Sequence, residues 1–232
     1  MKNKIELKKR DGSVFFEYED EDNTVKKTLR AYIRKENGAL KVNLQNVDLS
    51  GANLNGLDLN LVDLCFADLS NADLNNTNLV FSNLSHANLS NAKLIRADLR
   101  FSDLSHSKLF GVKMTSANLI GADLKDTDLR QAFLTYTNLY NADLSDADLK
   151  YTDLSYTDLS NVKLENVCLY KANLSCSNLC EADLSNADLR YADLMQAFLA
   201  YANLSNADLR NSNLEGTDLT NAILDETNLN KS

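Results

Sequence analysis

Small and apolar residues recur along this chain with a period of five that begins near Lys41 and never slips. Written in blocks of five, the chain reads KVNLQ, NVDLS, GANLN and so on to ETNLN, which ends at Asn230. The fourth residue is Leu in 37 of the 38 blocks, with Met114 the exception, and the second is Ala, Ser, Thr, Val or, once, Leu57. Neither a helix nor a flat strand gives this spacing. A chain that turns a corner every five residues does, with the second and fourth residues inside.

The third residue of the block is polar and would face outward, being Asp at 18 places and Asn at 12. Repeats this short cannot enclose a core alone, so successive coils must stack to bury a continuous interior. We number the residues of each block 1 to 5, so that Asn43 is at position 3 and Leu44 at position 4. The pattern predicts an all-β solenoid over residues 41–232.

Residues 1–40 follow a different pattern and are predicted to form a small unit of their own. Lys4 to Lys9 and Ser13 to Glu19 alternate in polarity as strands do. Asp11 and Gly12 lie between them and favour a hairpin turn. This part of the chain therefore begins with a predicted β-hairpin.

A helix is predicted from about Val25 to Lys35, because Val25, Leu29 and Ile33 would share one face. Asn23 and Thr24 suit its N-cap, and Asn37-Gly38 tolerates the left-handed backbone that ends a helix. A hairpin and helix of this size bury little surface alone. We expect them to cap the first coil of the solenoid, whose apolar end and strand edge would otherwise be exposed.

The repeated A-(D/N)-L motif, as in Ala67-Asp68-Leu69 and Ala187-Asp188-Leu189, resembles the pentapeptide repeat family over residues 41–230. The resemblance implies a right-handed quadrilateral parallel β-helix with four pentapeptides to a coil, hence about 9.5 coils for the 38 repeats. At about 4.8 Å per coil, the strand spacing, the rod would be roughly 45 Å long.

Outward-facing residues support a coil of 20 residues, because like residues recur at that spacing and would stack as ladders. The pairs are Phe81 and Phe101, His86 and His106, Lys93 and Lys113, Asp126 and Asp146, Tyr136 and Tyr156, and Arg190 and Arg210.

Composition narrows the class of protein. A formal net charge of −9 argues against direct binding to nucleic acid, which requires cations to neutralise phosphates. No stretch is apolar enough to span a membrane, and the basic N-terminus lacks the apolar run of a signal peptide. The four cysteines lack regular spacing and suggest reduced thiols. We therefore expect a cytoplasmic protein.

Charge is distributed unevenly over the four faces of the predicted rod. We name these faces A to D by their Leu columns, which start at Leu44, Leu49, Leu54 and Leu59, and include the two residues on either side of each Leu. Face A carries ten acids and two bases, face B six and seven, face C four and three, and face D five and two. Most of the negative charge therefore lies on face A.

An Asp at position 3 belongs to the repeat consensus, so the acids at other positions are more informative about function. Five of the seven such acids lie on face A: Asp126, Asp146, Glu165, Asp225 and Glu226. The strip predicted to bind a partner consists of Asp103, Asp123, Asp126, Asp143, Asp146, Glu165 and Asp183.

Face B shows the opposite arrangement. Its basic column lies beside a column of position-3 Asp residues, so we expect the two to compensate each other at the surface. The bases are Arg130, Lys150, Arg190 and Arg210, and the acids are Asp128, Asp148, Asp188 and Asp208.

The sequence gives little support for catalysis, a metal or a cofactor. His86 and His106 would stack on one edge near Cys65, but two histidines without a firm third ligand make a weak metal site. Cys176 and Cys180 have no accompanying base to activate a thiol. We predict no catalytic residue, no metal and no cofactor.

Aromatic residues at outward positions are better candidates for a functional role. Phe81 and Phe101 are predicted to stack on one corner as a protein contact. The remaining aromatics predicted to be exposed are Phe66, Phe110, Tyr136, Tyr151, Tyr156, Tyr170 and Tyr191.

Two functions fit these features. The first is a rigid scaffold that binds an unknown protein partner through the anionic face and the aromatics. The second comes from the family resemblance: its Qnr-like members are DNA mimics that bind DNA gyrase. B-DNA carries about 26 charges over 45 Å, whereas residues 41–232 hold 25 acids and 14 bases. The chain also lacks the loops that interrupt the coils of Qnr-like proteins, and has Leu rather than Phe in its core.

At the C-terminal end, Thr217 to Ser232 contains no helix that could plug the last coil. Four leucines would therefore end the solenoid uncovered, and we expect the C-terminal coils to form an end-to-end homodimer, as in family relatives. These residues are Leu214, Leu219, Leu224 and Leu229.

Overall fold

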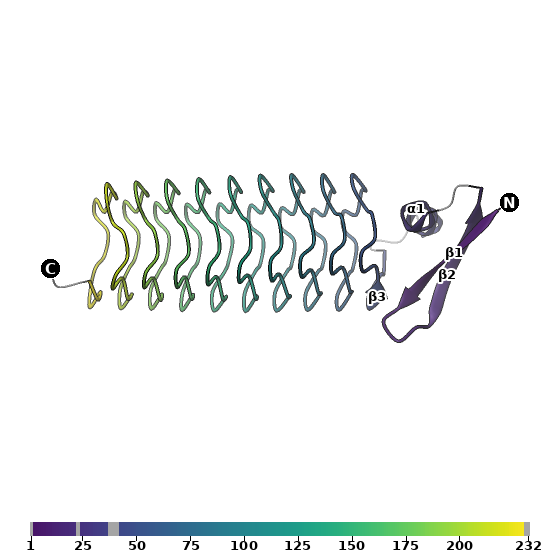
Figure 1. Ribbon diagram of the computed structural model, residues 1–232, viewed down its shortest axis with the longest axis horizontal. Coiled ribbons are helices and arrows are strands. Elements are labelled where there is room, and N and C mark those ends of the chain that lie inside the picture. Colours follow the sequence, from purple (N-terminus) through teal and green to yellow (C-terminus); the bar gives the residue numbers. More distant parts are fainter. Residues whose placement is uncertain (1, 22–23, 37–41, 230–232) are drawn as a thin grey trace.

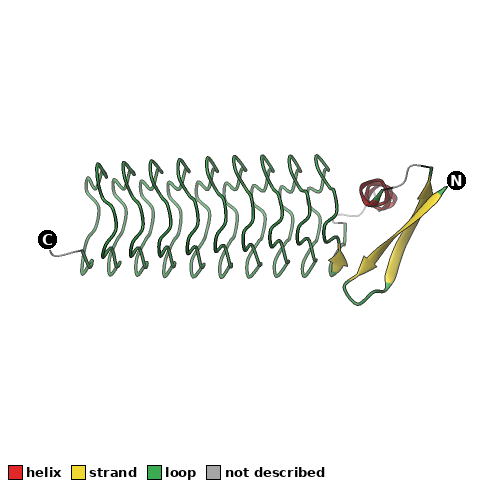
Figure 2. Cartoon of the chain, in the orientation of Figure 1, coloured by secondary structure: helices red, strands yellow, loops and turns green. Residues whose placement is uncertain are grey.

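The computed structural model describes residues 2–21, 24–36 and 42–229. It is a straight rod with a small α+β unit at its N-terminal end (Figures 1 and 2). That unit contains strands β1 (Asn3–Lys9) and β2 (Val14–Asp20) and helix α1 (Val25–Lys35). Strand β3 (Val47–Asp48) belongs to the first coil of the rod and completes a sheet of order β2-β1-β3.

The rod is a parallel solenoid with a period of 20 residues. Each position-3 residue forms a parallel bridge with the residue 20 positions later, from Asn43 with Asp63 to Asp208 with Asn228. Four pentapeptides therefore complete one coil, and residues 20 apart lie directly above one another. The predicted all-β repeat architecture is confirmed, while its handedness stays a prediction.

The backbone hydrogen bonds of one repeat show how the coils hold together. In a typical repeat, the amide of Leu64 donates to Asn83 O, Phe66 donates to Ser85 O, and Asp68 donates to Val47 O. The amide of Ala67 closes the corner by donating to Leu64 O. Positions 1 to 4 thus all have backbone acceptors, and the amide at position 5 is the one left over.

Position 3 supplies the missing acceptor. At every Asp or Asn in position 3 from Asn43 to Asp218, the side-chain Oδ1 accepts a hydrogen bond from the amide two residues later, at 2.9–3.3 Å. This is the Asx turn, which Asp and Asn form equally well. It explains why the two alternate freely at this position.

Each corner places the position-1 residue in a left-handed conformation. From Asn46 to Glu226 every position-1 residue has a φ between +53° and +69°. A positive φ at the third residue of a hydrogen-bonded turn defines a type II turn. Gly and Asn tolerate this conformation best, and they fill 16 of these 37 positions.

The interior consists of positions 2 and 4, as predicted. The Leu side chains from Leu44 to Leu209 and Met114 are buried, as are the small residues beside them. Where position 2 is Ser or Thr, its hydroxyl usually donates to a nearby backbone carbonyl, as Ser82 does to Leu79 O at 2.6 Å. The core is therefore a stack of leucine layers without buried charge.

The N-terminal unit packs directly on the first coil. Leu7 of β1 and Leu29 of α1 are buried in the same apolar cluster as Leu44. Lys9 pairs with Val47 between β1 and β3, and Tyr32 Oη donates to Asn43 O at 3.1 Å. The sheet therefore continues from the hairpin into the solenoid.

The predicted hairpin and helix are confirmed. Each strand differs from its predicted bounds by one residue or less, and α1 has the predicted ends. Thr24 is the N-cap, accepting from the Lys27 amide. The Asn23 cap, the Asn37-Gly38 stop and the boundary at residue 40 lie outside the described residues.

Replacing Asp73 tests the role of position 3. Asp73→Asn keeps the acceptor for the Asn75 amide, which lies 3.1 Å from Oδ1, and should leave stability nearly unchanged. Asp73→Ala removes it and should lower the free energy of unfolding by about 1 kcal/mol. Urea denaturation followed by circular dichroism measures both. Equal loss in the two variants would contradict the assignment.

Candidate interaction surface

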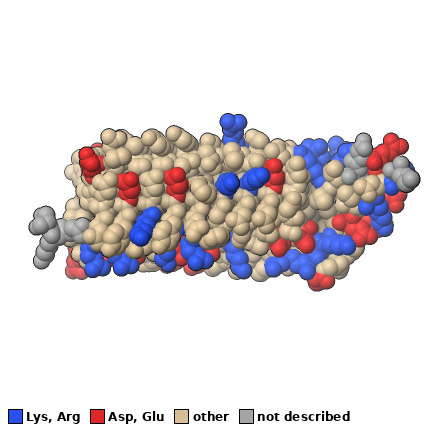
Figure 3. All heavy atoms as spheres, in the orientation of Figure 1, with Lys and Arg blue, Asp and Glu red and all other residues tan. Residues whose placement is uncertain are grey.

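The outward positions build straight columns along the rod. Position 3 lies at the middle of each face, and positions 5 and 1 flank each corner. In the view of Figure 3, charged side chains gather in rows that run along the rod, with uncharged surface between them. The functional question is which of these columns the fold itself requires.

Column A, at the centre of face A, stacks three carboxylates without an intervening amide. Asp103 bridges to Asp123, and Asp123 to Asp143. On other faces an Asn often separates the acids and donates to the Asp one coil earlier, as Asn78 does to Asp58 at 2.9 Å. No such donor reaches Asp103 or Asp123 among the described residues, so this stretch has concentrated negative charge.

Asp143 differs from its two neighbours because lysines neutralise it. Lys125 Nζ lies 3.2 Å and Lys163 Nζ 3.4 Å from its Oδ2. Burial alone would raise its pKa, but hydrogen bonds from Ser145 and Lys125 outweigh burial and lower it. Asp143 is thus the least available acid of the predicted strip.

The corner between faces A and B carries a mixed column. The rings of Phe66 and His86 stack with centroids 4.7 Å apart, and those of His86 and His106 with centroids 4.9 Å apart. His106 Nδ1 lies 3.5 Å from Asp126 Oδ2. The predicted histidine stack is confirmed, and no group of three metal-ligating side chains occurs in the part of the chain that the structure describes.

The remaining acids of the predicted strip lie farther along face A. Asp146 is exposed at the same corner as Asp126 and accepts from Asn166 at 3.1 Å. Glu165 is exposed, and Asp183 is half-buried and accepts from Asn203. Lys163 interrupts the strip between Asp143 and Asp183, so Asp103 to Asp146 forms its continuous part.

Phe81 and Phe101 stack on the corner between faces D and A, with ring centroids 5.2 Å apart. Both are about half exposed, and exposed Leu61 precedes them in the same column. A Cβ at Gly121 would lie 2.7 Å from the Phe101 ring, so a larger residue there would force the ring to shift. We call Leu61, Phe81 and Phe101 the apolar ridge.

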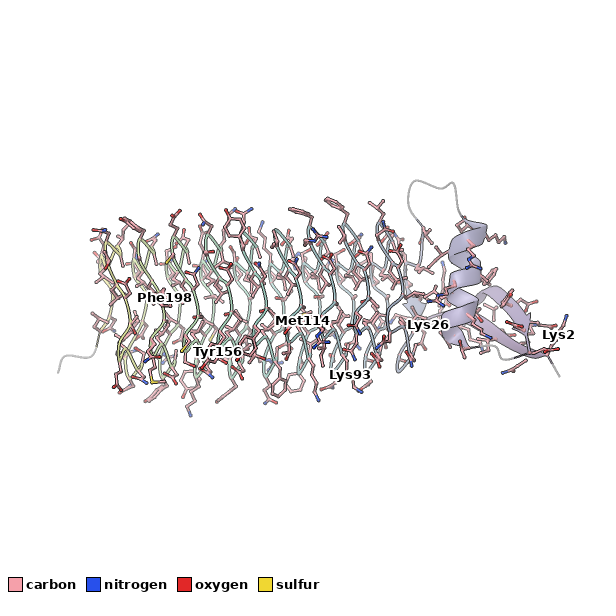
Figure 4. The ribbon with its side chains drawn as sticks, turned by 90° about the horizontal axis from the view of Figure 1, so that it is seen from above. Lys2, Lys26, Lys93, Met114, Tyr156 and Phe198 are labelled. Carbon is pink, nitrogen blue, oxygen red and sulfur yellow. The ribbon has the colours of Figure 1, made fainter. Side chains whose placement is uncertain are left out.

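Two aromatics expected to be exposed are half-buried. Phe110 lies against Arg130, whose Cζ is 5.8 Å from the ring centroid, and Tyr170 lies among neighbouring side chains. Exposed aromatics that the sequence reasoning passed over include Phe133, Tyr140, Phe198 and Tyr201. All four lie at outward repeat positions (3, 5, 3 and 1), which was the available signal. Phe198 is labelled in Figure 4, as is Tyr156, whose predicted exposure is confirmed.

The compensated ladder predicted on face B is present. Arg130, Arg190 and Arg210 each bind the Asp two residues earlier through two guanidinium nitrogens, at 2.6–2.9 Å. Lys150 Nζ lies 3.1 Å from Asp148. The arginine hydrogen bonds lower the pKa of Asp128, Asp188 and Asp208. Face B therefore exposes little net charge.

The C-terminal coil is open in the described residues. Leu209 is 2% exposed, whereas Leu224 is 39% and Leu229 40% exposed. Leu214 and Leu219 are half-buried and pack against the end of the core. An uncovered apolar end is what an end-to-end homodimer requires, and the dimer stays a prediction.

Among the described residues the chain has no helix long and apolar enough to cross a membrane.

Taken together, the coils define a four-sided parallel β-solenoid, a repeat protein whose surface is made of single-residue columns. The sequence profile for pentapeptide repeats matches eight copies between residues 43 and 232. The chain belongs to the pentapeptide repeat family.

Solved structures of other pentapeptide repeat proteins resemble this chain. HetL, involved in heterocyst differentiation regulation in the cyanobacterium Nostoc sp. strain PCC 7120, is 35% identical, with 87% of this chain and 93% of that chain covered and a TM-score of 0.55. Rfr23 from the cyanobacterium Cyanothece 51142 is 38% identical over 44% of this chain and 64% of that chain, with a TM-score of 0.26.

QnrB1, a plasmid-mediated fluoroquinolone resistance protein, is 20% identical over 83% of this chain and 91% of that chain, with a TM-score of 0.41. A likeness of that size carries no argument about function. No curated protein matches this sequence.

The Asp98 and Arg100 pair tests the energetic role of such ion pairs outside the face B ladder. Hydrogen bonds from Arg100 lower the pKa of Asp98. The pair therefore stabilises the fold above the unfolded pKa of about 4, and this contribution disappears as pH falls through the lowered folded pKa. Arg100→Gln should lower the urea midpoint at pH 7, and the difference from the wild type should shrink as pH falls below about 4.

Lys113→Gln is the matched control, because Lys113 is exposed and has no ion pair among the described residues. Its midpoint should follow that of the wild type at each pH. A loss for Arg100→Gln that does not shrink as pH falls from 7 through the acidic range would show that the arginine acts through packing rather than charge.

Proposed function

We propose that this protein is a rigid, non-enzymatic scaffold that binds a protein partner through face A and the apolar ridge. The observation that carries the proposal is the presence of bulky aromatics at corner positions whose left-handed backbone favours Gly or Asn. Members of the pentapeptide repeat family are generally structural or interaction proteins rather than enzymes.

The corner conformation makes the aromatics costly for the fold. A non-glycine residue in the left-handed region is disfavoured by about 1–2 kcal/mol, with Asn among the least affected. Phe81 has a φ of +54° and Phe101 one of +57°, yet both rings remain about half exposed to solvent. The stacking of the two rings offsets about 0.5–1.5 kcal/mol of the cost of this backbone conformation. The ridge therefore adds little to stability, which supports a role in contact with another molecule.

The charge beside the ridge identifies the chemistry of the partner. Face A adjoins the ridge. Asp103 and Asp123 lie in the column at the centre of this face, and Asp126 and Asp146 lie in the column at its other corner. Most of these carboxylates have no lysine or arginine within 4 Å among the described residues, in contrast to face B. The partner we propose is a basic protein surface with an apolar side chain that packs on the ridge.

HetL, the similar protein named above, is described as involved in regulation of differentiation. A regulatory role through binding fits a chain of this shape, and we extend that general class, not its pathway, to this protein. The N-terminal unit has a supporting role in the proposal: by covering the first coil it keeps the rod ordered and its columns aligned.

A DNA-mimicking protein that binds gyrase is the alternative. B-DNA exposes phosphates on both strands around its whole circumference. Here four of the six acids of face B are paired with bases, and only face A is strongly anionic. The geometry therefore favours a partner that contacts one side of the rod. A gyrase supercoiling assay separates the two proposals, because a mimic inhibits supercoiling and a one-sided scaffold does not.

Reversal of charge on face A tests the proposed surface. Asp126→Lys with Asp146→Lys should remove the specific partner in a pull-down from the source organism, because both residues lie at exposed corners of the strip. We expect at least a tenfold loss of captured partner. Comparative mass spectrometry of the bound proteins measures it.

The matched control combines Glu181→Lys with Glu215→Lys. These substitutions change net charge equally at exposed acids outside the strip, and the control should capture the partner as the wild type does. If the strip variant retains every protein that the wild type binds, face A is a solvated surface and the proposal fails.

A further inference from the structure

The ladder of face B is broken at one coil, and the break coincides with a cluster of tyrosines. Its acidic column runs through Asp128, Asp148, Cys168, Asp188 and Asp208, and the flanking column through Arg130, Lys150, Tyr170, Arg190 and Arg210. At residues 166–170 both the carboxylate and the base are therefore replaced. The replacement leaves the next corner, at Lys171, without its usual neighbours.

Three tyrosine rings surround the Lys171 ammonium. Its Nζ lies 5.9 Å from the ring centroid of Tyr151, 5.4 Å from that of Tyr170 and 5.9 Å from that of Tyr191. The rings of Tyr151 and Tyr191 each meet Tyr170 edge-on, with centroids 6.0 and 5.6 Å apart. The side chain of Lys171 is thus held by cation–π contacts in one place.

Lys171 has no carboxylate within 4 Å among the described residues, whereas Lys150 and Arg190 on either side are paired with Asp148 and Asp188. The thiol of Cys168 does not compensate, because burial raises its pKa and keeps it neutral at pH 7. The site therefore presents one uncompensated positive charge on a protein of net charge −9.

The fold does not require this cluster. Tyr151, Lys171 and Tyr191 occupy the left-handed corner position, with φ of +61°, +56° and +60°. The same column holds Asn71 and Asn211, which suit that conformation better. About half of each ring of Tyr151 and Tyr191 is exposed. Strained, exposed tyrosines around a fixed cation indicate a binding role.

We propose that Tyr151, Tyr170, Lys171 and Tyr191, the tyrosine–lysine patch, form a second docking surface that takes an acidic segment of a partner protein. A carboxylate would accept hydrogen bonds from the Lys171 ammonium, while the flanking rings shield the contact from water. Tyrosine is among the residues most enriched at energetically dominant interface positions. The occupant is acidic because the cation of the patch is the charge left without a partner.

This surface is distinct from face A. The faces follow one another in the order A, B, C, D around the coil, so the corner between B and C is diagonally opposite the corner between D and A that bears the apolar ridge. The rod could therefore hold a basic partner on one edge and an acidic one on the other. The tyrosine–lysine patch shares no residue with face A or the apolar ridge.

A direct test uses a dye-labelled decaglutamate peptide with the full-length protein, followed by fluorescence anisotropy at 50 mM salt. The wild type should bind decaglutamate and not decaglutamine. Lys171→Ala should weaken binding about tenfold, the effect of losing one charge-assisted hydrogen bond. Lys113→Ala removes the same charge at an exposed position of face C and should stay within twofold of the wild type.

A second variant separates the rings from the charge. Tyr151→Asn with Tyr191→Asn retains every charge and suits the corner backbone, yet should weaken binding several-fold because the ammonium loses two of its three rings. Denaturation curves confirm that each variant is folded. Absence of binding by the wild type, or equal binding by Lys171→Ala and Lys113→Ala, would overturn the proposal. Either result leaves the face A pull-down unaffected, because that test changes other residues.

Discussion

The backbone amide at position 5 is the group on which this architecture depends. The coil ladder and the corner turn provide acceptors for the other four amides of each repeat, as they do for Leu64, Phe66, Ala67 and Asp68. A half-buried amide without an acceptor is costly, and one short side chain two residues earlier satisfies it. This hydrogen bond explains why Asp or Asn fills position 3 in 30 of the 38 repeats.

The same constraint limits which residues can carry function. Positions 2 and 4 form the core, and position 3 is occupied by the corner hydrogen bond, so an Asp there, such as Asp103, has one oxygen left for a partner. The side chains at positions 1 and 5 neither form the core nor accept the corner hydrogen bond. The apolar ridge, Asp126 and Lys171 all lie at position 1, where the fold prefers Gly or Asn, and the preference makes each departure informative.

The sequence was sufficient to predict the repeat, the core and the stacking at 20 residues, because a period of five with Leu in 37 of 38 repeats allows few other structures. The stacked Phe81 and Phe101 and the paired Arg130 and Asp128 followed from that register alone. The register did not predict which side chains extend far enough to contact residues in a neighbouring coil. Lys125 belongs to a coil different from that of Asp143, yet it neutralises that acid.

The tyrosine–lysine patch shows the same limit. Tyr151, Tyr170 and Tyr191 were recognisable as outward residues, but their convergence on Lys171 depends on rotamers of side chains from three successive coils. Tyr170 is half-buried for this reason. Register predicts which residues can be neighbours, and packing decides which of them meet.

The central claim is that corner aromatics serve contact rather than folding, and the unfolding of Phe81→Asn with Phe101→Asn tests it most directly. Asn suits the corner backbone, so the account predicts a free energy of unfolding within about 1 kcal/mol of the wild type, because the lost stacking and the relieved strain are of similar size. A loss of more than about 3 kcal/mol, typical of removing buried aromatics, would show that the ridge is part of the core and contradict the account.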